Sequence, residues 1–366
     1  MQESFPKPEN QPELPKYDPL RLLRGALRLM AVAGAAVLIL AVFLTAVFFL
    51  NKYTSRSAEI ARNFMGTRVE LKAYGDGASS AVRSALRKME EVSRQLNIFD
   101  SKSEISLINS MSGIAPVAVS RSTFDIIERS TTLSKPLSGV FDVSIGPLVD
   151  LWQFNKSDFS PPNQNEINET LRLVNYRNIE INPEIESVKL KVRGMKLNLG
   201  GVGKGFVIAV GRSVLVNAGI RNALISCGSS ISCIGKNPDG SLWRVGVRDP
   251  RDPARLIGAV ELMPGQALST SGDYEQFSVI DGKRVSHIIN PRTGRPASGV
   301  SSVTVLAGDS TTADILSTSV FVMGPWSGLR FLNSLENVEG LIVDANGNIS
   351  KTAGFDLKSL STEEAR

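Results

Sequence analysis

The only histidine in the 366 residues, His287, stands in the stretch SHIINPRTGRP, residues 286–296. An unperturbed imidazole titrates near neutral pH and is the usual general base of enzymes. The Asn-Pro and Thr-Gly pairs that follow favour turns, which would fix the direction of the imidazole. A histidine with a purely structural place in a surface turn would give the same pattern. The stretch alone therefore leaves a catalytic base and a surface histidine as alternatives.

A second candidate is the glycine-rich stretch NLGGVGKG, residues 198–205, which surrounds Lys204 with four glycines. It follows a predicted strand and opens a predicted helix. Bare backbone N–H groups and the helix dipole at such a place can hold an anion, and Lys204 adds a positive charge. Neither the P-loop nor the dinucleotide-binding pattern matches. A tight strand-to-helix turn is the alternative interpretation.

Asp314 and Thr318 form a third candidate, because they stand four residues apart on a helix predicted for residues 314–323. At that spacing their oxygens share one helix face. A carboxylate and a hydroxyl there could hold Mg²⁺, with waters and phosphate oxygens completing its coordination. The alternative is an aspartate in a first helical turn, where the helix dipole stabilises a negative charge.

Two further stretches combine small or acidic side chains with apolar surroundings. Residues 269–274, STSGDY, could form a loop around a nucleotide, although a plain β-turn would look the same. Residues 139–152, GVFDVSIGPLVDLW, contain Asp142 within an apolar run. A buried carboxylate needs a hydrogen-bonding partner, which the sequence does not identify.

Composition excludes several classes of protein. Hydrophobic residues make up 42% and charged residues 21%, as in ordinary folded proteins. The net charge of +5, without a basic stripe or a nucleic-acid motif, argues against nucleic-acid binding. The two cysteines, Cys227 and Cys233, exclude a disulfide-rich scaffold and form no C-x-x-C pair, although they could pair with each other. One histidine and two cysteines provide no zinc-ligand set.

The periodicity of the chain predicts an α+β fold. Strands are predicted at residues 68–73, 187–192 and 302–306, and helices at residues 78–96, 123–134, 203–217 and 314–323. A polar loop at 155–170 is expected to lead into a helix. Helices and strands alternate irregularly and without a repeated βαβ unit, which favours α+β over a doubly wound parallel sheet.

The N-terminal region predicts a membrane anchor. Residues 29–50 contain no charge in 22 positions, enough to span a bilayer core of about 30 Å as a helix. The segment lacks a small-residue cleavage site, so we expect an uncleaved signal anchor. Arg21, Arg24 and Arg28 favour a cytoplasmic N-terminus, although four basic residues follow the segment by position 68. We expect a disordered cytoplasmic tail (1–28), the anchor (29–50), a linker (51–62) and one extracytoplasmic, periplasmic-side domain (63–360).

The order of the motifs along residues 63–350 is more specific than any single motif. MGT (65–67), FDSKSEISLIN (99–109), GVFDVSIGPLVDLW, NLGGVGKG, LSTSGDY, HIINPRTG and ADILSTSVFVMG follow in one series. In this the chain resembles the ApbE family of FAD:protein FMN transferases. The resemblance implies a single α+β catalytic domain with a flavin cleft. It also implies a Mg²⁺-dependent reaction that splits FAD, releases AMP and joins FMN to a threonine or serine hydroxyl of a partner redox protein.

The resemblance also implies roles for individual residues. His287 corresponds to the family's catalytic histidine, and the metal would be held by Asp314, Thr318 and a backbone carbonyl near Gly201. The positions that match flavin-nucleotide contacts are Met65, Phe99, Val140, Phe141, Asp142, Asn198, Lys204, Ser271, Gly272, Asp273, Ile288 and Ser317.

The chain departs from the family pattern at three places. The family usually reads N-x-G-G-D where this chain has Ser226-Cys-Gly-Ser-Ser230. The family also often has an acidic residue five positions after the lysine, where this chain has Ala209. The membrane anchor replaces the family's lipid-bearing cysteine. Two other functions stay open on the sequence: a Mg²⁺-dependent FAD pyrophosphatase that yields FMN and AMP, and a flavin-binding scaffold without turnover.

Overall fold

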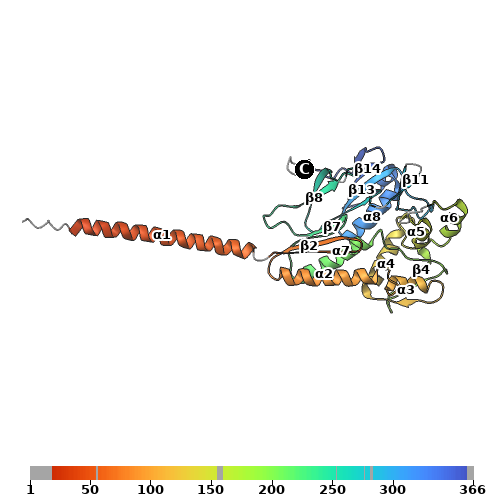
Figure 1. Cartoon of the computed structure of the whole chain (residues 1–366), viewed down its shortest axis with the longest axis horizontal. Coiled ribbons are helices and arrows are strands. Elements are labelled where there is room, and N and C mark those ends of the chain that lie inside the picture. Colours follow the sequence, from red (N-terminus) through yellow and green to blue (C-terminus); the bar gives the residue numbers. More distant parts are fainter. Residues whose placement is uncertain are drawn as a thin grey trace, which may run out of the picture. The chain divides into compact units, whose positions relative to one another are not determined.

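The computed structural model describes residues 19–54, 57–154, 160–252, 254–275, 277–280 and 283–360. The chain divides after Ser55 into two compact units, which Figure 1 draws together. In the first unit, helix α1 (Pro19–Thr54) contains the stretch Leu27–Val47, with a mean hydropathy of 2.6 and no residue buried. Its length and composition suit a membrane span or a signal sequence.

Helix α1 is longer than the predicted anchor at both ends. Residues 19–28, predicted as disordered tail, and residues 51–54, predicted as linker, are helical. The leucine, arginine and alanine residues that precede the apolar stretch are strong helix formers, which explains the extension. The remainder of the predicted linker also differs, because a strand begins at Ser57. The predicted tail's first 18 residues lie outside the described residues.

The second unit is built on an eight-stranded antiparallel sheet of order β1-β2-β6-β7-β10-β13-β14-β15. The strands are β1 (Ser57–Phe64), β2 (Thr67–Tyr74), β6 (Asn222–Cys227), β7 (Ser230–Ile234), β10 (Ala267–Gly272), β13 (Val300–Ala307), β14 (Glu339–Asp344) and β15 (Ile349–Lys351). β13 is buried on both faces along its whole length, so its burial does not alternate, and its polar residues Ser301, Ser302 and Thr304 are buried as well.

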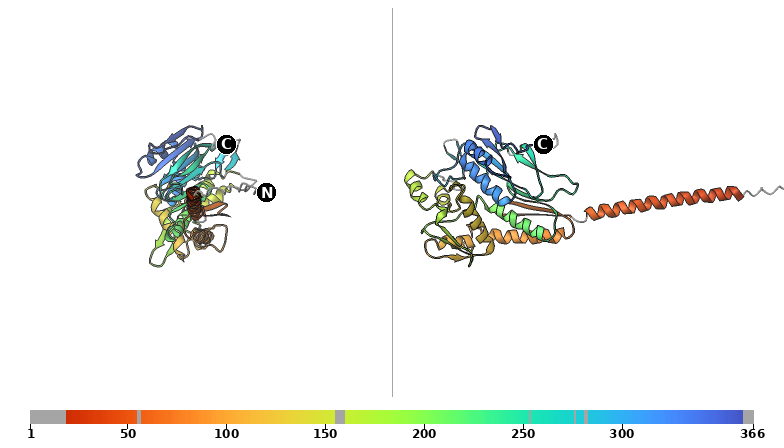
Figure 2. Two further views of the ribbon diagram at one scale, coloured as in Figure 1. Left: turned by 90° about the vertical axis from the view of Figure 1, so that its left-hand side faces the viewer. Right: turned by 180° about the vertical axis from the view of Figure 1, so that it is seen from behind.

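Three helices cover one face of this sheet: α2 (Ala78–Gln95), α7 (Gly203–Asn217) and α8 (Ser310–Met323). α7 packs between the other two, and the right-hand view in Figure 2 shows α7 in green beside α2 in orange. Glycines allow this close packing. A Cβ on Gly211 would lie 2.4 Å from Met89 Sδ of α2, and one on Gly205 would lie 2.2 Å from the Ser310 carbonyl oxygen of α8.

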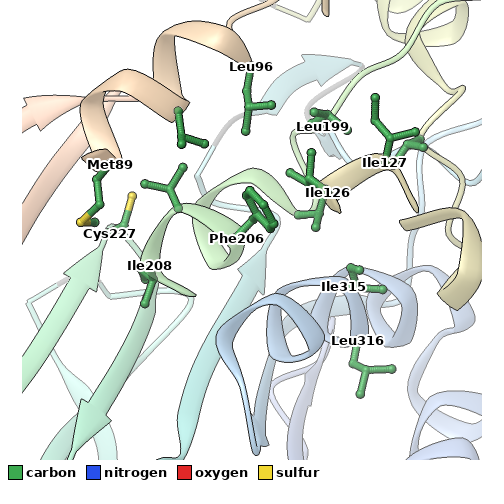
Figure 3. Packing of buried hydrophobic residues seen from close by; sticks show 14 of the residues in the cluster. Met89, Leu96, Ile126, Ile127, Leu199, Phe206, Ile208, Cys227, Ile315 and Leu316 are labelled. Atoms are coloured by element: carbon green, nitrogen blue, oxygen red, sulfur yellow. The ribbon is translucent and has the colours of Figure 1, made fainter. Parts of the chain in front are cut away.

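The main core lies between these helices and the sheet. Figure 3 shows Met89 and Leu96 from α2, Phe206 and Ile208 from α7, and Cys227 from β6 converging there. The buried positions of α2 recur every three or four residues, which gives the helix one apolar face. Burial of this face against α7 and the sheet fixes the framework that carries the glycine-rich stretch.

A second apolar cluster covers the outer face of the sheet, the face turned away from α7 and α8. The ribbon of β8 (Trp243–Arg248) and β9 (Leu256–Leu262) contributes Trp243, Val245 and Leu262. They pack with Leu268 of β10 and Leu306 of β13. The sheet is therefore buried on both faces at its centre, as in a layered α+β domain.

Smaller elements surround one end of the sheet. A three-stranded sheet joins β3 (Val117–Ala118), β5 (Ser187–Leu190) and β4 (Ile179–Asn182). The hairpin of β11 (Phe277–Ile280) and β12 (Lys283–Ser286) precedes His287. The remaining helices are α3 (Glu104–Ser110), α4 (Arg121–Ser134), α5 (Gly146–Trp152), α6 (Gln164–Leu171), the 3₁₀ turn η1 (Tyr176–Asn178) and α9 (Pro325–Leu332).

The structure confirms the predicted α+β class and the existence of every helix and strand predicted from periodicity. The strand predicted at 187–192 ends at Leu190, and the polar loop predicted at 155–170 is shorter than expected, because α6 begins at Gln164; residues 155–159 of that loop lie outside the described residues. One boundary was wrong in a way that matters. α8 begins at Ser310, four residues before the predicted start, because the Asp309 side chain accepts a hydrogen bond from Thr312 N at 3.0 Å and caps the helix. Asp314 therefore lies in the second turn of α8, and the first-turn interpretation of this residue was wrong.

Candidate active site

A cavity of about 1670 Å³ opens at the end of the main sheet. Fourteen of the sixteen predicted site residues line it, from segments far apart in the sequence. They are Met65, Phe99, Val140, Phe141, Asp142, Asn198, Gly201, Lys204, Ser271, Gly272, His287, Ile288, Asp314 and Thr318. Phe99 is 87% exposed, so it lies at the mouth of the cavity, whereas Asp314 is only 3% exposed.

Asp314 lies where α7, α8 and β10 meet. Its Oδ2 accepts a hydrogen bond from Gly205 N at 2.8 Å, and its Oδ1 accepts one from Ser269 Oγ at 3.0 Å. Ser269 Oγ in turn lies 2.9 Å from Ser230 Oγ, and both serines are fully buried. Burial raises the pKa of Asp314 above its usual range, although Lys204 and the two hydrogen bonds oppose this. The carboxylate is held in one orientation by groups from two neighbouring elements, α7 and β10.

Thr318 lies one turn further along α8 and belongs to a second hydroxyl cluster. Ser271 Oγ of β10 lies 2.9 Å from Ser317 Oγ and 3.2 Å from Thr318 Oγ1. A Cβ on Gly201 would lie 3.1 Å from Thr318 Oγ1, so the Gly201 backbone passes directly beside this hydroxyl. The three predicted metal-binding residues thus line one cavity, and Gly201 and Thr318 are in direct proximity.

Lys204 supplies positive charge to the cavity wall. Its Nζ donates hydrogen bonds to Ser229 Oγ at 3.2 Å and to Glu275 Oε2 at 3.3 Å. Burial lowers the pKa of Lys204, but the negative charges of Glu275 and Asp314 outweigh it and raise the pKa above the ordinary value. Lys204 is therefore protonated at neutral pH and remains a cation inside the cavity.

Asp142, whose partner the sequence does not identify, accepts hydrogen bonds from two backbone N–H groups and one serine hydroxyl. Its Oδ1 accepts hydrogen bonds from Ser144 N at 2.8 Å and Ser144 Oγ at 2.6 Å, and its Oδ2 accepts one from Tyr176 N at 2.8 Å. Burial raises the pKa of Asp142, against the effect of these bonds. The carboxylate ties residues 142–144 to η1 and shapes the cavity wall.

His287 lies half-buried in the cavity lining between β12 and a tight hairpin. In the hairpin, Ile289 pairs with Pro296, and Asn290 N donates to the Arg295 carbonyl at 2.8 Å. Trp152 Nε1 of α5 donates to the Gly294 carbonyl at 2.7 Å. Gly294 has φ +67°, and a Cβ there would lie 2.6 Å from Ile167 of α6. The Asn-Pro and Thr-Gly turns therefore dock the hairpin on α5 and α6 and position His287.

Two predicted flavin contacts lie outside the cavity lining. Both Asp273 oxygens accept from Arg251, at 2.7 and 3.0 Å, and Arg251 also donates to Ser301 Oγ. Ser317 is fully buried behind Ser271, and its hydroxyl donates to the Asp314 carbonyl at 3.0 Å. The side chains of these two residues hold the cavity wall from behind, because each is bonded to its own partners.

Sequence reasoning missed several residues that the structure brings to the site. Glu275 follows directly after the STSGDY stretch and forms an ion pair with Lys204. The negative charge of Glu275 is the one feature of the sequence that could have indicated this pair. Ser229 contacts Lys204 and Ser230 contacts Ser269, so the two serines that stand in place of the family's Gly-Asp take part in hydrogen bonds at the site. The two cysteines are buried and unpaired, and burial raises the pKa of Cys227 to about 12, which keeps its thiol protonated.

The donor set suits a hard cation such as Mg²⁺. Asp314 and Thr318 offer a carboxylate and a hydroxyl, and the backbone at Gly201 passes beside Thr318 in the cavity lining. Among the residues that the structure describes, no three or more His, Cys, Asp or Glu side chains cluster as a ligand set. Mg²⁺ usually takes only one or two protein carboxylates and completes its shell with water and substrate phosphates, so the donors present fit it.

Comparison with known proteins agrees with this geometry. The model of the ApbE family matches residues 65–342. A FAD:protein FMN transferase of Klebsiella pneumoniae is 32% identical over 303 residues, covering 82% of this chain and 92% of that protein. One of Vibrio cholerae is 31% identical, covering 80% and 90%. The crystal structure of the ApbE protein of Thermotoga maritima superposes with a TM-score of 0.75 at 31% identity, covering 81% of this chain and 97% of that one. This chain therefore belongs to the ApbE family.

Proposed function

We propose that this chain is a Mg²⁺-dependent FAD:protein FMN transferase that attaches FMN to a threonine or serine of a partner redox protein. One observation carries the proposal. The cavity gathers His287, Lys204 and Asp314 from three distant parts of the chain, and these are the groups that a phosphoryl transfer to a hydroxyl needs. The curated names of the relatives support the same reaction.

In the proposed reaction the acceptor hydroxyl oxygen attacks the phosphorus on the FMN side of the FAD pyrophosphate. A new phosphoester bond forms, the P–O bond to AMP breaks, and AMP leaves with the bridging oxygen. His287 accepts the hydroxyl proton, and its docked hairpin holds the imidazole in place during the transfer. Lys204 neutralises charge on the phosphate oxygens, since it stays protonated within the wall.

Mg²⁺ would be held by Asp314, Thr318 and the backbone at Gly201, and when bound it would neutralise negative charge on the pyrophosphate. Asp314 is prepared for this role by Gly205 N and Ser269 Oγ, which fix the orientation of its carboxylate. Met65, Phe99, Val140, Phe141 and Asn198 contribute apolar surface and an amide to the same cavity, where the nucleotide would lie.

We further propose that α1 anchors the enzyme in the cytoplasmic membrane and that the second unit acts on the periplasmic side. The apolar stretch of α1 supports a single membrane span, and Arg21, Arg24 and Arg28 precede it. A fusion of the chain's C-terminus to a reporter that is active only outside the cytoplasm tests the orientation. An inactive reporter fusion would contradict it.

The activity is tested by mixing the purified full-length chain with FAD, Mg²⁺ and a threonine-containing acceptor domain. We expect fluorescent flavin that stays on the acceptor after denaturation. FMN and AMP without labelled acceptor would indicate hydrolysis instead, and unchanged FAD would indicate a scaffold without turnover.

Two variants separate the roles within the site. His287→Ala should keep FAD binding while transfer falls by about 10²–10⁴-fold, the usual contribution of a general base. Asp314→Asn should lose affinity for Mn²⁺, measured by isothermal titration in the presence of a non-hydrolysable nucleotide. Transfer at the wild-type rate by His287→Ala, or unchanged metal affinity in Asp314→Asn, would remove the respective residue from the mechanism.

A further inference from the structure

We propose that the acceptor polypeptide binds in a groove on the outer face of the main sheet, with Arg248 as its recognition residue. The groove is the part of the cavity lining that lies on the outer face of the sheet, and Gly272, beside Tyr274, is the predicted flavin position that adjoins it. It is lined by Arg68, Glu70, Ser226, Ile231, Leu268 and Arg248, together with Gly246, Thr270 and Tyr274. The inference rests on the proposed function, because it places the second substrate of that reaction.

Strand register shows that the groove floor is one continuous row of side chains. Glu70 of β2 lies opposite Ser226 of β6, Ser226 lies opposite Ile231 of β7, and Ile231 lies opposite Leu268 of β10. Ser269 and Ser271 of β10 point toward α8, where they contact Asp314 and Ser317. Because side chains alternate along a strand, Leu268 and the rest of the row point to the other face.

The dimensions suit a short extended segment. The row crosses three inter-strand spacings from β2 to β10, about 14 Å, which corresponds to about four residues of extended chain. The whole cavity, at about 1670 Å³, exceeds the roughly 300–1,000 Å³ typical of pockets for a single small ligand. A transferase must accommodate both a nucleotide and a polypeptide, and the outer branch provides the additional space.

The groove changes character along its length. Leu268 is 3% exposed and belongs to the second apolar cluster, Ile231 and Ser226 are half-buried, and Arg68 at the β2 end is exposed. A segment that enters at β2 would therefore pass from a polar rim to an apolar inner end. Protein interfaces have the same arrangement, with an apolar buried part and a polar, solvent-accessible rim.

The inner end of the groove adjoins the nucleotide-binding cleft through Ser229. Thr270 N of β10 donates to the Ser229 carbonyl at 3.1 Å, and the Ser229 hydroxyl accepts from Lys204 Nζ at 3.2 Å. Thr270 lines the groove and Lys204 faces the cleft, so this turn forms the wall between them. A hydroxyl of a peptide bound in the groove would therefore lie beside Lys204, the positive charge that we place at the pyrophosphate.

The charges of the groove indicate which side chain the acceptor carries near its hydroxyl. Arg68 pairs with Glu70 at 2.5 Å, and Lys204 pairs with Glu275. The Arg248 side chain is exposed, and its guanidinium makes no hydrogen bond or ion pair with any residue that the structure describes, although its backbone pairs with Leu256 in the β8–β9 ribbon. Among the described residues that line the groove, Arg248 is therefore a positive charge without a negative partner, and it is complementary to an aspartate or glutamate of the acceptor segment.

The test measures binding of an end-capped ten-residue peptide to the full-length chain in detergent, by fluorescence anisotropy. The peptide carries one central threonine and two aspartates, and a matched peptide carries asparagines in their place. The variants are Arg248→Glu, which reverses the charge, and Ser226→Trp, which fills the floor. Arg255→Glu is the control, because Arg255 is exposed near the same ribbon and does not line the cavity.

We expect Arg248→Glu to weaken binding of the aspartate peptide at least tenfold and to leave the asparagine peptide unchanged. Ser226→Trp should weaken binding of both peptides, and Arg255→Glu neither. FAD affinity, measured by flavin fluorescence, should stay within twofold in all three. Equal binding of the aspartate peptide by wild type and Arg248→Glu, no binding to wild type, or a parallel loss of FAD affinity would overturn the proposal.

The same mixtures separate this proposal from the proposed function. Binding as expected without flavin on the peptide after incubation with FAD and Mg²⁺ would contradict the transferase activity and leave the groove as a peptide site. Labelled peptide with no effect of either groove variant on binding would do the reverse.

Discussion

Replacement of Gly205 by alanine tests whether the contact between α7 and α8 positions Asp314. A Cβ on Gly205 would lie 2.2 Å from the Ser310 carbonyl oxygen and 2.7 Å from Asp314 Cβ. Ordinary contact begins at 3.4 Å, so the two helices must part by about 1.2 Å. That movement also stretches the bond from Gly205 N to Asp314 Oδ2, now 2.8 Å, and the bond from Ser310 Oγ to the Gly205 carbonyl.

The expected loss of stability follows from three contributions. Overpacking costs about 1–3 kcal/mol, and a buried carboxylate that loses a hydrogen bond costs about 1–3 kcal/mol. The higher helix propensity of alanine recovers about 1 kcal/mol. We therefore expect Gly205→Ala to lower the free energy of unfolding by about 1–5 kcal/mol. A shift of about 1 Å at a reacting site can cost about 10²-fold in rate, so transfer should fall by a similar factor.

Urea denaturation followed by tryptophan fluorescence and an assay of transfer give the two quantities. Gly203→Ala is the matched control, since it lies in the same helix and its Cβ would meet only the flexible end of Met65, at 3.1 Å. We expect its stability to change by less than about 1 kcal/mol. If Gly205→Ala unfolded at the wild-type urea concentration and kept its rate, the claim that this contact holds Asp314 would be wrong.

Two more variants probe the elements that carry the site. Ser269→Ala removes the hydrogen bond to Asp314 Oδ1 and should weaken Mn²⁺ affinity. Ser319→Ala is the control, because it removes another buried hydroxyl, which is bonded to the Ile315 carbonyl, and it should leave Mn²⁺ affinity unchanged. Equal affinities of the two variants would exclude Ser269 as a positioning residue. Asp309→Ala removes the α8 cap and should cost about 0.5–2 kcal/mol at pH 7. Burial opposes ionisation, but the bonds from Thr312 and the charge of Arg129 lower the pKa of Asp309 below the ordinary value of 3.8. The stability that this lowered pKa contributes is fully present above the ordinary pKa and is lost as pH falls through the folded-state pKa. The urea midpoints of wild type and Asp309→Ala should therefore converge in acid. A constant difference between the midpoints down to pH 2 would show that the charge of Asp309 does not contribute to the cap.

Local patterns predicted those elements whose residues carry their own signal. The helix at residues 203–217 was predicted with the bounds that the structure has, because Gly203 begins an apolar run and Asn217 precedes a turn. The strand at 302–306 was equally clear from its β-branched residues. The start of α8 was missed because Ser310, Thr311 and Thr312 look like loop residues until Asp309 is recognised as their cap.

The site was predictable in its members but not in its pairings. Lys204 and Asp314 were identified as single residues, yet the ion pair between Lys204 and Glu275 joins positions 71 residues apart. The same holds for Arg251, which takes the Asp273 carboxylate that the resemblance assigned to the flavin. A sequence shows which side chains can carry charge, whereas the fold decides which of them neutralise each other before a ligand arrives.

The order of strands in the main sheet has a consequence for how the protein is made. Val69 of β2 pairs with Cys227 of β6, 158 positions later in the chain. At a synthesis rate of about 5–20 residues per second, β2 waits roughly 8–30 s with β1 as its only partner. Over that time its other edge can pair with foreign strands. We therefore expect the nascent chain to depend on a holding chaperone until β6 emerges. Because Asp314 comes later still, the chemistry can begin only on a nearly complete chain.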